Sequence, residues 1–346
     1  MEGFIPESIT EPSWHSASFY RCEGTDLRCT LCPHGCLLRE GDVGLCRVRR
    51  RRGVEMETAT FSAAVVHVDN VERKPLYHFA PGRRVLTIAP PGCSLSCNYC
   101  QNFRISQIGR VPALPWVGAQ VDPSELVARA DDDDAILGFS YSEPSLAIEL
   151  TLAIAELTAR PLVWKTNGYM TPEAVEAVAP HLAAVNVDLK APDDARSRSL
   201  TGGALGPVID TIGRFVRAGV WVEVSTPLIP DFNADAESVK RMAAIVCRAG
   251  AHVPWHLLRF IPEFRMREMR PTRPDELAMA SAVGSAAGLR HVYVERALGA
   301  DGRNTACPGC RRDVVTRDIW KLRENLLVDG ACPDCGTRIE GRWETN

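Results

Sequence analysis

Three cysteines with an unusual spacing, Cys93, Cys97 and Cys100, lie in the segment GCSLSCNYC that begins at Gly92. This spacing lets three thiolates surround one metal cluster and supplies no fourth ligand. Ferredoxin-type segments supply four thiolates to an iron–sulfur cube, at other spacings. A cube held by three thiolates leaves one iron open, and an open metal position indicates chemistry rather than a structural role. A zinc site or a chance triplet is the alternative interpretation.

A second set of cysteines lies near the C-terminus, where two Cys-Pro-x-Cys knuckles are separated by 21 residues. Four thiolates paired in this way suit tetrahedral zinc in a closed structural ribbon. We therefore expect zinc here, with an auxiliary iron–sulfur cluster as the alternative, because four cysteines can bind either metal. The four expected ligands are Cys307, Cys310, Cys332 and Cys335.

A third set lies near the N-terminus, with the spacing Cys-x2-Cys-x3-Cys-x9-Cys. Its expected ligands are Cys29, Cys32, Cys36 and Cys46. Zinc and an iron–sulfur cluster both accept four thiolates, so the metal stays open at this point. Cys22 and His34 lie close by in the sequence and are alternative ligands.

Composition places the chain among ordinary globular enzymes. It has 346 residues, of which 45% are hydrophobic and 24% charged, and its formal net charge is −3. This charge gives no general attraction to nucleic acid or to an anionic membrane, so we expect neither as a partner. We expect the basic run at Arg49–Arg52 to be solvated surface, with a phosphate or an acidic partner as the alternative.

The chain start and the cysteine content together predict a cytoplasmic protein. The first residues are acidic and lack the basic start and apolar core of a signal peptide. No apolar run approaches the ~18 residues that are typical of a membrane span. In the cytoplasm, the 13 cysteines are better explained as metal ligands than as disulfides.

Short apolar strands alternate with helical segments through the middle of the chain. The expected strands are residues 85–89, 135–140, 161–166, 184–189, 220–225, 255–260 and a short one at 291–294. The expected helices are residues 144–157, one opening at Thr171-Pro172, 207–218, 234–248 and 273–287. Such alternation predicts an α/β fold with a parallel sheet. We expect a partial (β/α)6 barrel, with a doubly wound sheet as the alternative.

Polar side chains follow most of these strands at the point where each strand ends. They include Ser140–Glu143, Lys165–Gly168, Asp188–Lys190, Ser225–Thr226 and His256. In parallel barrels the active site lies at the carboxyl ends of the strands. The agreement among five strands predicts an enzyme.

Six further segments extend these patterns into a family resemblance. They are residues 72–79 (ERKPLYHF), 100–106 (CQNFRIS), 140–144 (SYSEP), 166–169 (TNGY), 188–190 (DLK) and 259–262 (RFIP). Together with the cysteine triad, they resemble the AmmeMemoRadiSam-system radical SAM proteins, relatives of pyruvate formate-lyase activating enzyme. The resemblance covers nearly the whole chain. With it we expect an N-terminal cysteine-rich metal-binding module (1–70), a radical SAM barrel (71–298) and a C-terminal zinc-ribbon-like module (299–346).

The resemblance implies a [4Fe–4S] cluster on the triad, whose open iron binds S-adenosylmethionine and breaks it to a 5′-deoxyadenosyl radical. It also implies cofactor contacts at matching positions. Tyr99 would lie beside the adenine, Ser142 and Glu143 at the methionine amine, Asn167 and His256 near the ribose, Asp188 and Lys190 near the cofactor, and Ser225 at the methionine carboxylate.

Three structural interpretations of these contacts stay open. Asn167-Gly168 suits a turn, Asp188 and Lys190 suit a strand-end ion pair, and His256 suits a buried structural histidine. One departure from the wider pattern also stands out, since Lys165 occupies the place where activating enzymes carry an acid.

The implied reaction is hydrogen-atom abstraction from a small molecule or a modified protein residue, with flavodoxin or ferredoxin as electron donor. Installation of a glycyl radical on a partner protein is the alternative within the family. An alternative of another class is a multi-zinc module that binds nucleic acid or protein. It would hold zinc at all three cysteine groups and would leave the polar strand ends unexplained.

Overall fold

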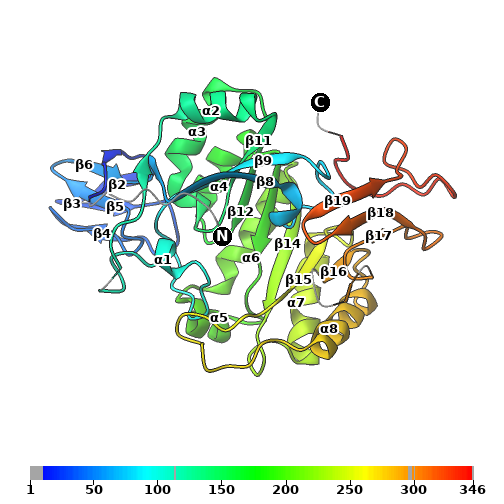
Figure 1. The fold of residues 1–346 in the computed structure, drawn as a ribbon. Helices are drawn as coiled ribbons and strands as arrows, with labels where there is room; N and C mark the ends of the chain where they lie inside the picture. Colours follow the sequence, from blue (N-terminus) through cyan, green and yellow to red (C-terminus); the bar gives the residue numbers. More distant parts are fainter. Residues whose placement is uncertain (1–10, 113, 295–297, 300, 345–346) are drawn as a thin grey trace.

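The seven predicted strands and one further strand form an eight-stranded sheet in the computed structural model, which describes residues 11–112, 114–294, 298–299 and 301–344 (Figure 1). In spatial order the strands are β16 (Val292–Val294), β15 (Trp255–Arg259), β14 (Trp221–Leu228), β13 (Ala184–Asp188), β12 (Leu162–Thr166), β11 (Ala135–Phe139), β9 (Arg84–Ala89) and β8 (Val65–Asn70). All neighbours from β9 to β16 are parallel, and β8 adds an antiparallel edge.

The order of the parallel strands decides between the two predicted layouts. From β9 to β16 the spatial order follows the sequence without a reversal. A doubly wound sheet reverses its order at a switch point, whereas a barrel proceeds in one direction. The α/β class and the partial barrel are therefore confirmed, and the doubly wound alternative is wrong.

The connecting helices are α1 (Phe103–Ser106), α2 (Pro123–Asp132), α3 (Ile148–Leu157), α4 (Pro172–Val178), α5 (Asp194–Thr201), α6 (Leu205–Arg217), α7 (Ala236–Ala249) and α8 (Pro274–Ala286), with 3-10 turns at Val71–Arg73, Pro144–Ala147 and Ala179–His181. Among the described residues, the helices α3, α4, α6, α7 and α8 agree with the five predicted segments, whereas α1, α2 and α5 were not predicted. The expected cap of α4 is present, since Thr171 Oγ1 accepts a bond of 3.2 Å from Ala174 N. The helix predicted from residue 144 begins with a 3-10 turn instead.

Short strands of the N-terminal cysteine-rich segment lie on one side of the sheet (blue in Figure 1). They are β1 (His15–Ser16), β2 (Tyr20–Glu23), β3 (Asp26–Cys29), β4 (Leu37–Leu38), β5 (Arg49–Arg52), β6 (Glu55–Thr58) and β7 (Ser62–Ala63), which pairs with β10 (Ala119–Gln120). Buried apolar side chains of this segment, such as Leu31, Val48 and Met56, belong to the same apolar cluster as the barrel core. The segment therefore shares one core with the barrel.

The basic run at Arg49–Arg52 is not simply solvated surface as predicted. Arg49 is only 1% exposed, and its guanidinium lies 2.9 Å from the carboxylate of Glu149 in α3. The ion pair explains the burial, because a buried charge requires a partner. Arg50 and Arg51 pair with Glu57 and Asp26.

The C-terminal ribbon spans both edges of the open sheet (orange and red in Figure 1). Its strands are β17 (Thr305–Ala306), β18 (Asp313–Asp318) and β19 (Lys321–Asn325). At the β8 edge, Asn70 Nδ2 donates to Trp320 O at 2.9 Å. At the β16 edge, Val294 N donates to Gly302 O at 2.8 Å, and the hydroxyls of Tyr293 and Thr305 lie 2.7 Å apart. The ribbon therefore bridges the first and last strands.

Two predictions, on the chain start and on the domain boundaries, concern residues that the structure does not describe or that adjoin such residues. The acidic chain start lies in residues 1–10, outside the described residues, and the expected boundary at 298 adjoins undescribed residues 295–297. The three-part division stays a prediction. In the described part of the chain, no helix combines the length and the apolar composition required to cross a bilayer.

Candidate active site and cysteine sites

The cysteine triad lies in a loop that follows β9, and backbone bonds fix this loop against the rest of the barrel. Ser96 N donates to Thr201 O at 2.8 Å, and Asn98 N donates to Leu200 O at 3.0 Å. Leu95 N, at 3.4 Å, and Asn167 Nδ2, at 3.5 Å, both donate to the sulfur of Cys93. Such donors stabilise a thiolate ligand, so the loop suits a metal cluster.

The triad offers three thiolates, which suits a cube in which each thiolate binds a different iron and the fourth iron stays open. Among the described residues, the four C-terminal cysteine sulfurs all lie within 4.8 Å of one another, as the ligands of a single ion do.

Burial raises the pKa of the triad thiols. The effect is largest for Cys93, while the pKa of Cys97 rises to about 12. For Cys100 burial again dominates, with a bond to Ser106 acting in the opposite direction. Buried thiols without a cation would stay protonated, so a bound metal is the partner that would make them thiolates.

One cavity of about 470 Å³ joins the triad to the carboxyl ends of the strands. Of the predicted cofactor contacts, it is lined by Tyr99, Ser142, Glu143, Asn167, Asp188 and Lys190. The sheet register explains this convergence, because β11, β12 and β13 are parallel neighbours whose ends meet at one edge. Six of the eight residues that the sequence predicted as cofactor contacts therefore line this cavity.

Glu143 is almost completely buried and is held by three donors. Its carboxylate accepts from Ser145 N at 3.0 Å, Thr166 Oγ1 at 2.6 Å and Asn167 N at 2.8 Å. Burial raises the pKa of Glu143, and these hydrogen bonds oppose the rise. The carboxylate therefore fixes the end of β12 at the cavity wall.

Asp188 lies between two lysines at the cavity wall. Its carboxylate accepts from Lys190 Nζ at 2.6 Å and also pairs with Lys165 Nζ. Burial alone would raise the pKa of Asp188, but the two ammonium groups outweigh it and lower the pKa. Asp188 therefore holds two ammonium groups and one carboxylate together at the cavity wall, where they can meet charged groups of a ligand.

Ser225 and His256 do not line this cavity. The Ser225 hydroxyl donates to Asn186 Oδ1 at 2.7 Å, and that oxygen also accepts from Lys165 Nζ at 2.7 Å. His256 Nε2 lies 2.6 Å from a carboxylate oxygen of Glu223. Both side chains are buried in the barrel interior with partners of their own. Sequence reasoning missed Glu223, although an acid inside an apolar strand was a visible signal.

The outer cavity wall contains residues that the sequence did not predict. Trp320 comes from the C-terminal ribbon, and the Arg73 guanidinium lies 4.5 Å from its ring centre. Tyr141 has a left-handed backbone, with φ of 69°, and its hydroxyl donates to Asp69 at 3.0 Å. No local pattern marks Trp320, because only the folded chain brings the ribbon to the barrel.

The C-terminal cysteines form a compact group of four sulfurs. Cys307 and Cys335 have their sulfurs 3.6 Å apart, and so do Cys310 and Cys332. Four thiolates at the ~2.3 Å Zn–S distance of a tetrahedral site stand about 3.8 Å apart. The geometry of this group therefore fits a single tetrahedral ion.

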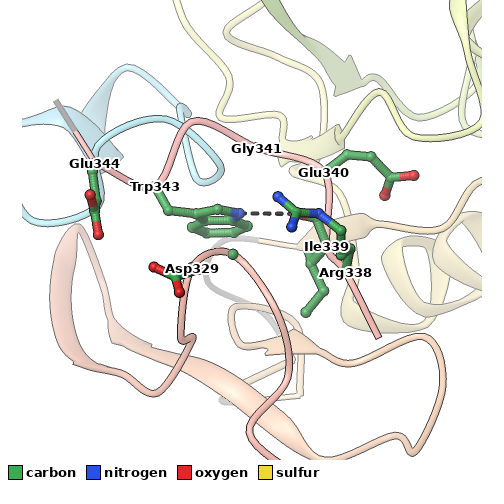
Figure 2. A pocket seen from close by; sticks show the side chains of 8 residues that line it. Asp329, Arg338, Ile339, Glu340, Gly341, Trp343 and Glu344 are labelled. Carbon is green, nitrogen blue, oxygen red and sulfur yellow. Dashed lines mark hydrogen bonds between the residues drawn. The ribbon is translucent and has the colours of Figure 1, made fainter. Parts of the chain in front are cut away.

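A further hollow, of about 530 Å³, lies at the C-terminal tail (Figure 2). Trp343 lies in it, and its indole nitrogen donates to Ile339 O at 2.9 Å. Neither a cysteine nor a strand-end residue of the barrel lines this hollow. The cavity beside the triad is therefore the candidate active site.

Comparison with known proteins agrees with this site. The family model described as the radical SAM superfamily matches residues 87–243. Protein MJ0808 of Methanocaldococcus jannaschii is 30% identical over 333 residues, which cover 94% of this chain and 98% of that protein. The fold and the site define a radical SAM protein, and the chain belongs to the radical SAM superfamily.

The chain is also related to activating enzymes of this superfamily. The isethionate sulfite-lyase activating enzyme of Nitratidesulfovibrio vulgaris is 29% identical over 180 residues, which cover 47% of this chain and 57% of that enzyme. Among solved structures, a radical SAM methyltransferase from Sphaerobacter thermophilus is 18% identical, with a TM-score of 0.48 over 70% of each chain.

Proposed function

We propose that this enzyme cleaves S-adenosylmethionine reductively and abstracts a hydrogen atom from a substrate held in the 470 Å³ cavity. A [4Fe–4S] cluster on Cys93, Cys97 and Cys100 would supply one electron that breaks the sulfonium C–S bond, giving methionine and a 5′-deoxyadenosyl radical. The observation that carries the proposal is the convergence of the triad, Tyr99 of the triad loop and five strand-end side chains on one cavity.

Different residues of the cavity wall would contact different parts of S-adenosylmethionine. Tyr99 offers an aromatic surface for the adenine, and Ser142, Glu143 and Asn167 offer polar groups to the methionine amine and the ribose. Asp188 and Lys190 offer charges of both signs. The proposed contacts at Ser225 and His256 are indirect, because Ser225 binds the amide that holds Lys165, and His256 binds Glu223.

The substrate we propose is a small molecule or a modified protein residue. Installation of a glycyl radical on a partner protein is the second candidate, favoured by the similarity to isethionate sulfite-lyase activating enzyme. A low-potential one-electron donor of the flavodoxin or ferredoxin class supplies the electron. We further propose zinc at the C-terminal cysteines, supported by the 3.6 Å sulfur separations.

The test is formation of 5′-deoxyadenosine by anaerobically reconstituted protein with dithionite and S-adenosylmethionine, measured by mass spectrometry. Cys97→Ala removes a ligand of the proposed cluster, so we expect the product to fall to the background level. Cys247→Ala is the matched control, because this cysteine lies in α7 away from all three sets, and it should keep wild-type activity. Equal activity of Cys97→Ala and wild type would contradict the proposal.

Deuterium tracing distinguishes the two substrate candidates. A labelled substrate that donates its hydrogen atom transfers deuterium into 5′-deoxyadenosine. Transfer from a small molecule or a modified residue supports the first candidate, and transfer from a partner protein's glycine supports the second.

A further inference from the structure

The N-terminal cysteines gather in one buried place at the boundary with the barrel. Cys29, Cys32 and Cys46 are 8%, 8% and 9% exposed. The sulfurs of Cys36 and Cys46 both lie 3.8 Å from the point where a Cβ on Gly44 would stand. Cys29 N donates to Cys36 O at 2.9 Å, so the segments that carry the four cysteines lie together.

The N-terminal group supplies a complete ligand set for an iron–sulfur cube, because four cysteine thiolates hold such a cube with one thiolate on each iron. The C-terminal cysteines differ, since their four sulfurs all lie within 4.8 Å of one another, as the ligands of one ion do.

The surroundings of the group supply what a buried cluster requires. Backbone groups of Leu31, His34 and Val48 form hydrogen-bond interactions with Cys29, Cys32 and Cys46 that favour their thiolates. Each donor lies two residues after its cysteine, as Leu95 does after Cys93 in the triad loop. Four thiolates on a cube carry net negative charge, and the buried Arg49 guanidinium interacts with Cys29 and Cys46.

The N-terminal group directly contacts the loop of the central triad. The carbonyl of Cys46 lies 2.9 Å from the place where a Cβ on Gly92 would stand, and Gly92 precedes Cys93. His34 Nε2 lies 2.9 Å from Ser94 O. The Arg110 guanidinium donates both to Leu45 O, at 2.7 Å, and to Cys93 O, at 2.8 Å. The N-terminal cysteine group and the triad loop are therefore in direct contact.

We propose that Cys29, Cys32, Cys36 and Cys46 hold a second [4Fe–4S] cluster, which passes single electrons to the central cluster. Four cysteine ligands leave no open iron, so this cluster exchanges electrons and binds no substrate. A low-potential flavodoxin- or ferredoxin-type donor reduces it by one electron, and that electron moves to the central cluster without a bond forming or breaking. This electron transfer between the two clusters, called the relay below, rests on the proposed function. The presence of the N-terminal cluster does not depend on it.

The metal content of a triad-free variant tests the cluster. In a Cys93→Ala/Cys97→Ala/Cys100→Ala protein, we expect roughly four iron atoms and four sulfides per chain to remain, against roughly eight of each in wild type. Zinc without iron in the N-terminal group of this variant would overturn the proposal. So would the absence of both metals from that group while the circular dichroism spectrum matches wild type.

The unmodified protein provides a test that does not depend on the folding of a variant. After reduction, its paramagnetic resonance spectrum should contain two cluster signals, and S-adenosylmethionine should alter one of them. A single signal that shifts completely would overturn the second cluster. Because this readout counts clusters, it stands even when no 5′-deoxyadenosine forms, an outcome that would contradict the proposed function instead.

The choice of reductant tests the relay. In Cys36→Ala, whose cysteine is half-buried, the central cluster should keep its response to S-adenosylmethionine. We expect this variant to form 5′-deoxyadenosine normally with dithionite and at least tenfold more slowly with a reduced flavodoxin, while Cys247→Ala matches wild type with both. Equal rates with flavodoxin in Cys36→Ala and wild type would overturn the relay and leave the metal assignment intact.

Discussion

At the scale of single residues, polar side chains at the strand ends have two kinds of surroundings: most line one cavity, and two bind partners inside the barrel. Most predicted contacts at strand ends line one cavity, because the carboxyl ends of the parallel strands meet at the same face of the barrel. Ser225 and His256 follow the same pattern, yet their side chains bind Asn186 and Glu223 inside the barrel. A one-dimensional pattern places a residue on an element and does not determine which long-range partner its side chain meets.

Asp188 provides a test of the charge balance in the cavity. Replacing Asp188 with Asn leaves Lys165 and Lys190 without their shared anion, so the free energy of unfolding should fall by about 3 kcal/mol. S-adenosylmethionine binding, measured by calorimetry, should weaken as well.

The matched control for this prediction removes one lysine together with the acid. Lys165→Met/Asp188→Asn has one cation fewer, so its stability in urea should lie above that of the single variant. A double variant that is no more stable than Asp188→Asn would refute the ion-pair explanation.

At the scale of elements, the alternation of strands and helices was readable because each buried parallel strand forms a short apolar run between helices. The observed strands from β9 to β16 confirm all seven predicted positions. The antiparallel edge β8 and the short N-terminal strands were not predicted. They are short or partly exposed, and pairing with distant segments defines them rather than local composition.

Gly92 joins the N-terminal segment to the triad loop, so its replacement should affect both metal sites. The backbone has φ of 88°, and an added Cβ would stand 2.7 Å from Val48 Cγ1. We expect Gly92→Ala to lose about 2–4 kcal/mol of stability and to bind less iron per chain.

Gly219→Ala is a close control for this effect. Gly219 has a similar φ of 77°, but nothing lies within 4 Å of its Cβ position. This variant should lose only about 1–2 kcal/mol and keep its full iron content. Equal iron in the two variants would show that the contact with Val48 does not matter.

Glu276 at the start of α8 gives a pH-dependent prediction. Its carboxylate accepts from Arg273 N at 2.8 Å and pairs with Arg270, and the bond to Arg270 lowers its pKa to about 2. A lowered pKa in the folded state stabilises the protein above the ordinary value near 4.5, and this stabilisation is lost as the pH falls toward 2.

Glu276→Gln should therefore lower the free energy of unfolding by about 1 kcal/mol at neutral pH. The difference from wild type should shrink steadily between pH 4.5 and 2, as measured by urea denaturation at each pH. A constant difference over this range would show that the charge of Glu276 has no part in the cap.

At the scale of the whole molecule, the N-terminal segment and the ribbon relate differently to the barrel. The first shares the barrel's apolar cluster, and the second has a small cluster of its own with Cys307, Val314, Val315, Cys332 and Ile339. Sequence reasoning located both cysteine sets from their spacing. It could not predict these contacts, which join residues far apart in the chain, such as Arg49 with Glu149 and Tyr77 with Arg317.

Because the ribbon has so small a core, metal should stabilise its fold. We expect Cys310→Ser to lose one zinc per chain, measured by mass spectrometry, and to become sensitive to proteolysis within β17–β19. Cys247→Ser should keep both its metal and its resistance. A zinc-free Cys310→Ser protein that resists protease like wild type would contradict this role of the metal.

The bridging of β8 and β16 by the ribbon also brings a ribbon side chain to the candidate active site. The ribbon bonds to Asn70 of β8 and to Tyr293 and Val294 of β16, so it joins the two edge strands. Its Trp320 lines the cavity beside the triad together with Arg73. A ligand with an acidic group would therefore meet a cation and an aromatic ring at this wall of the cavity.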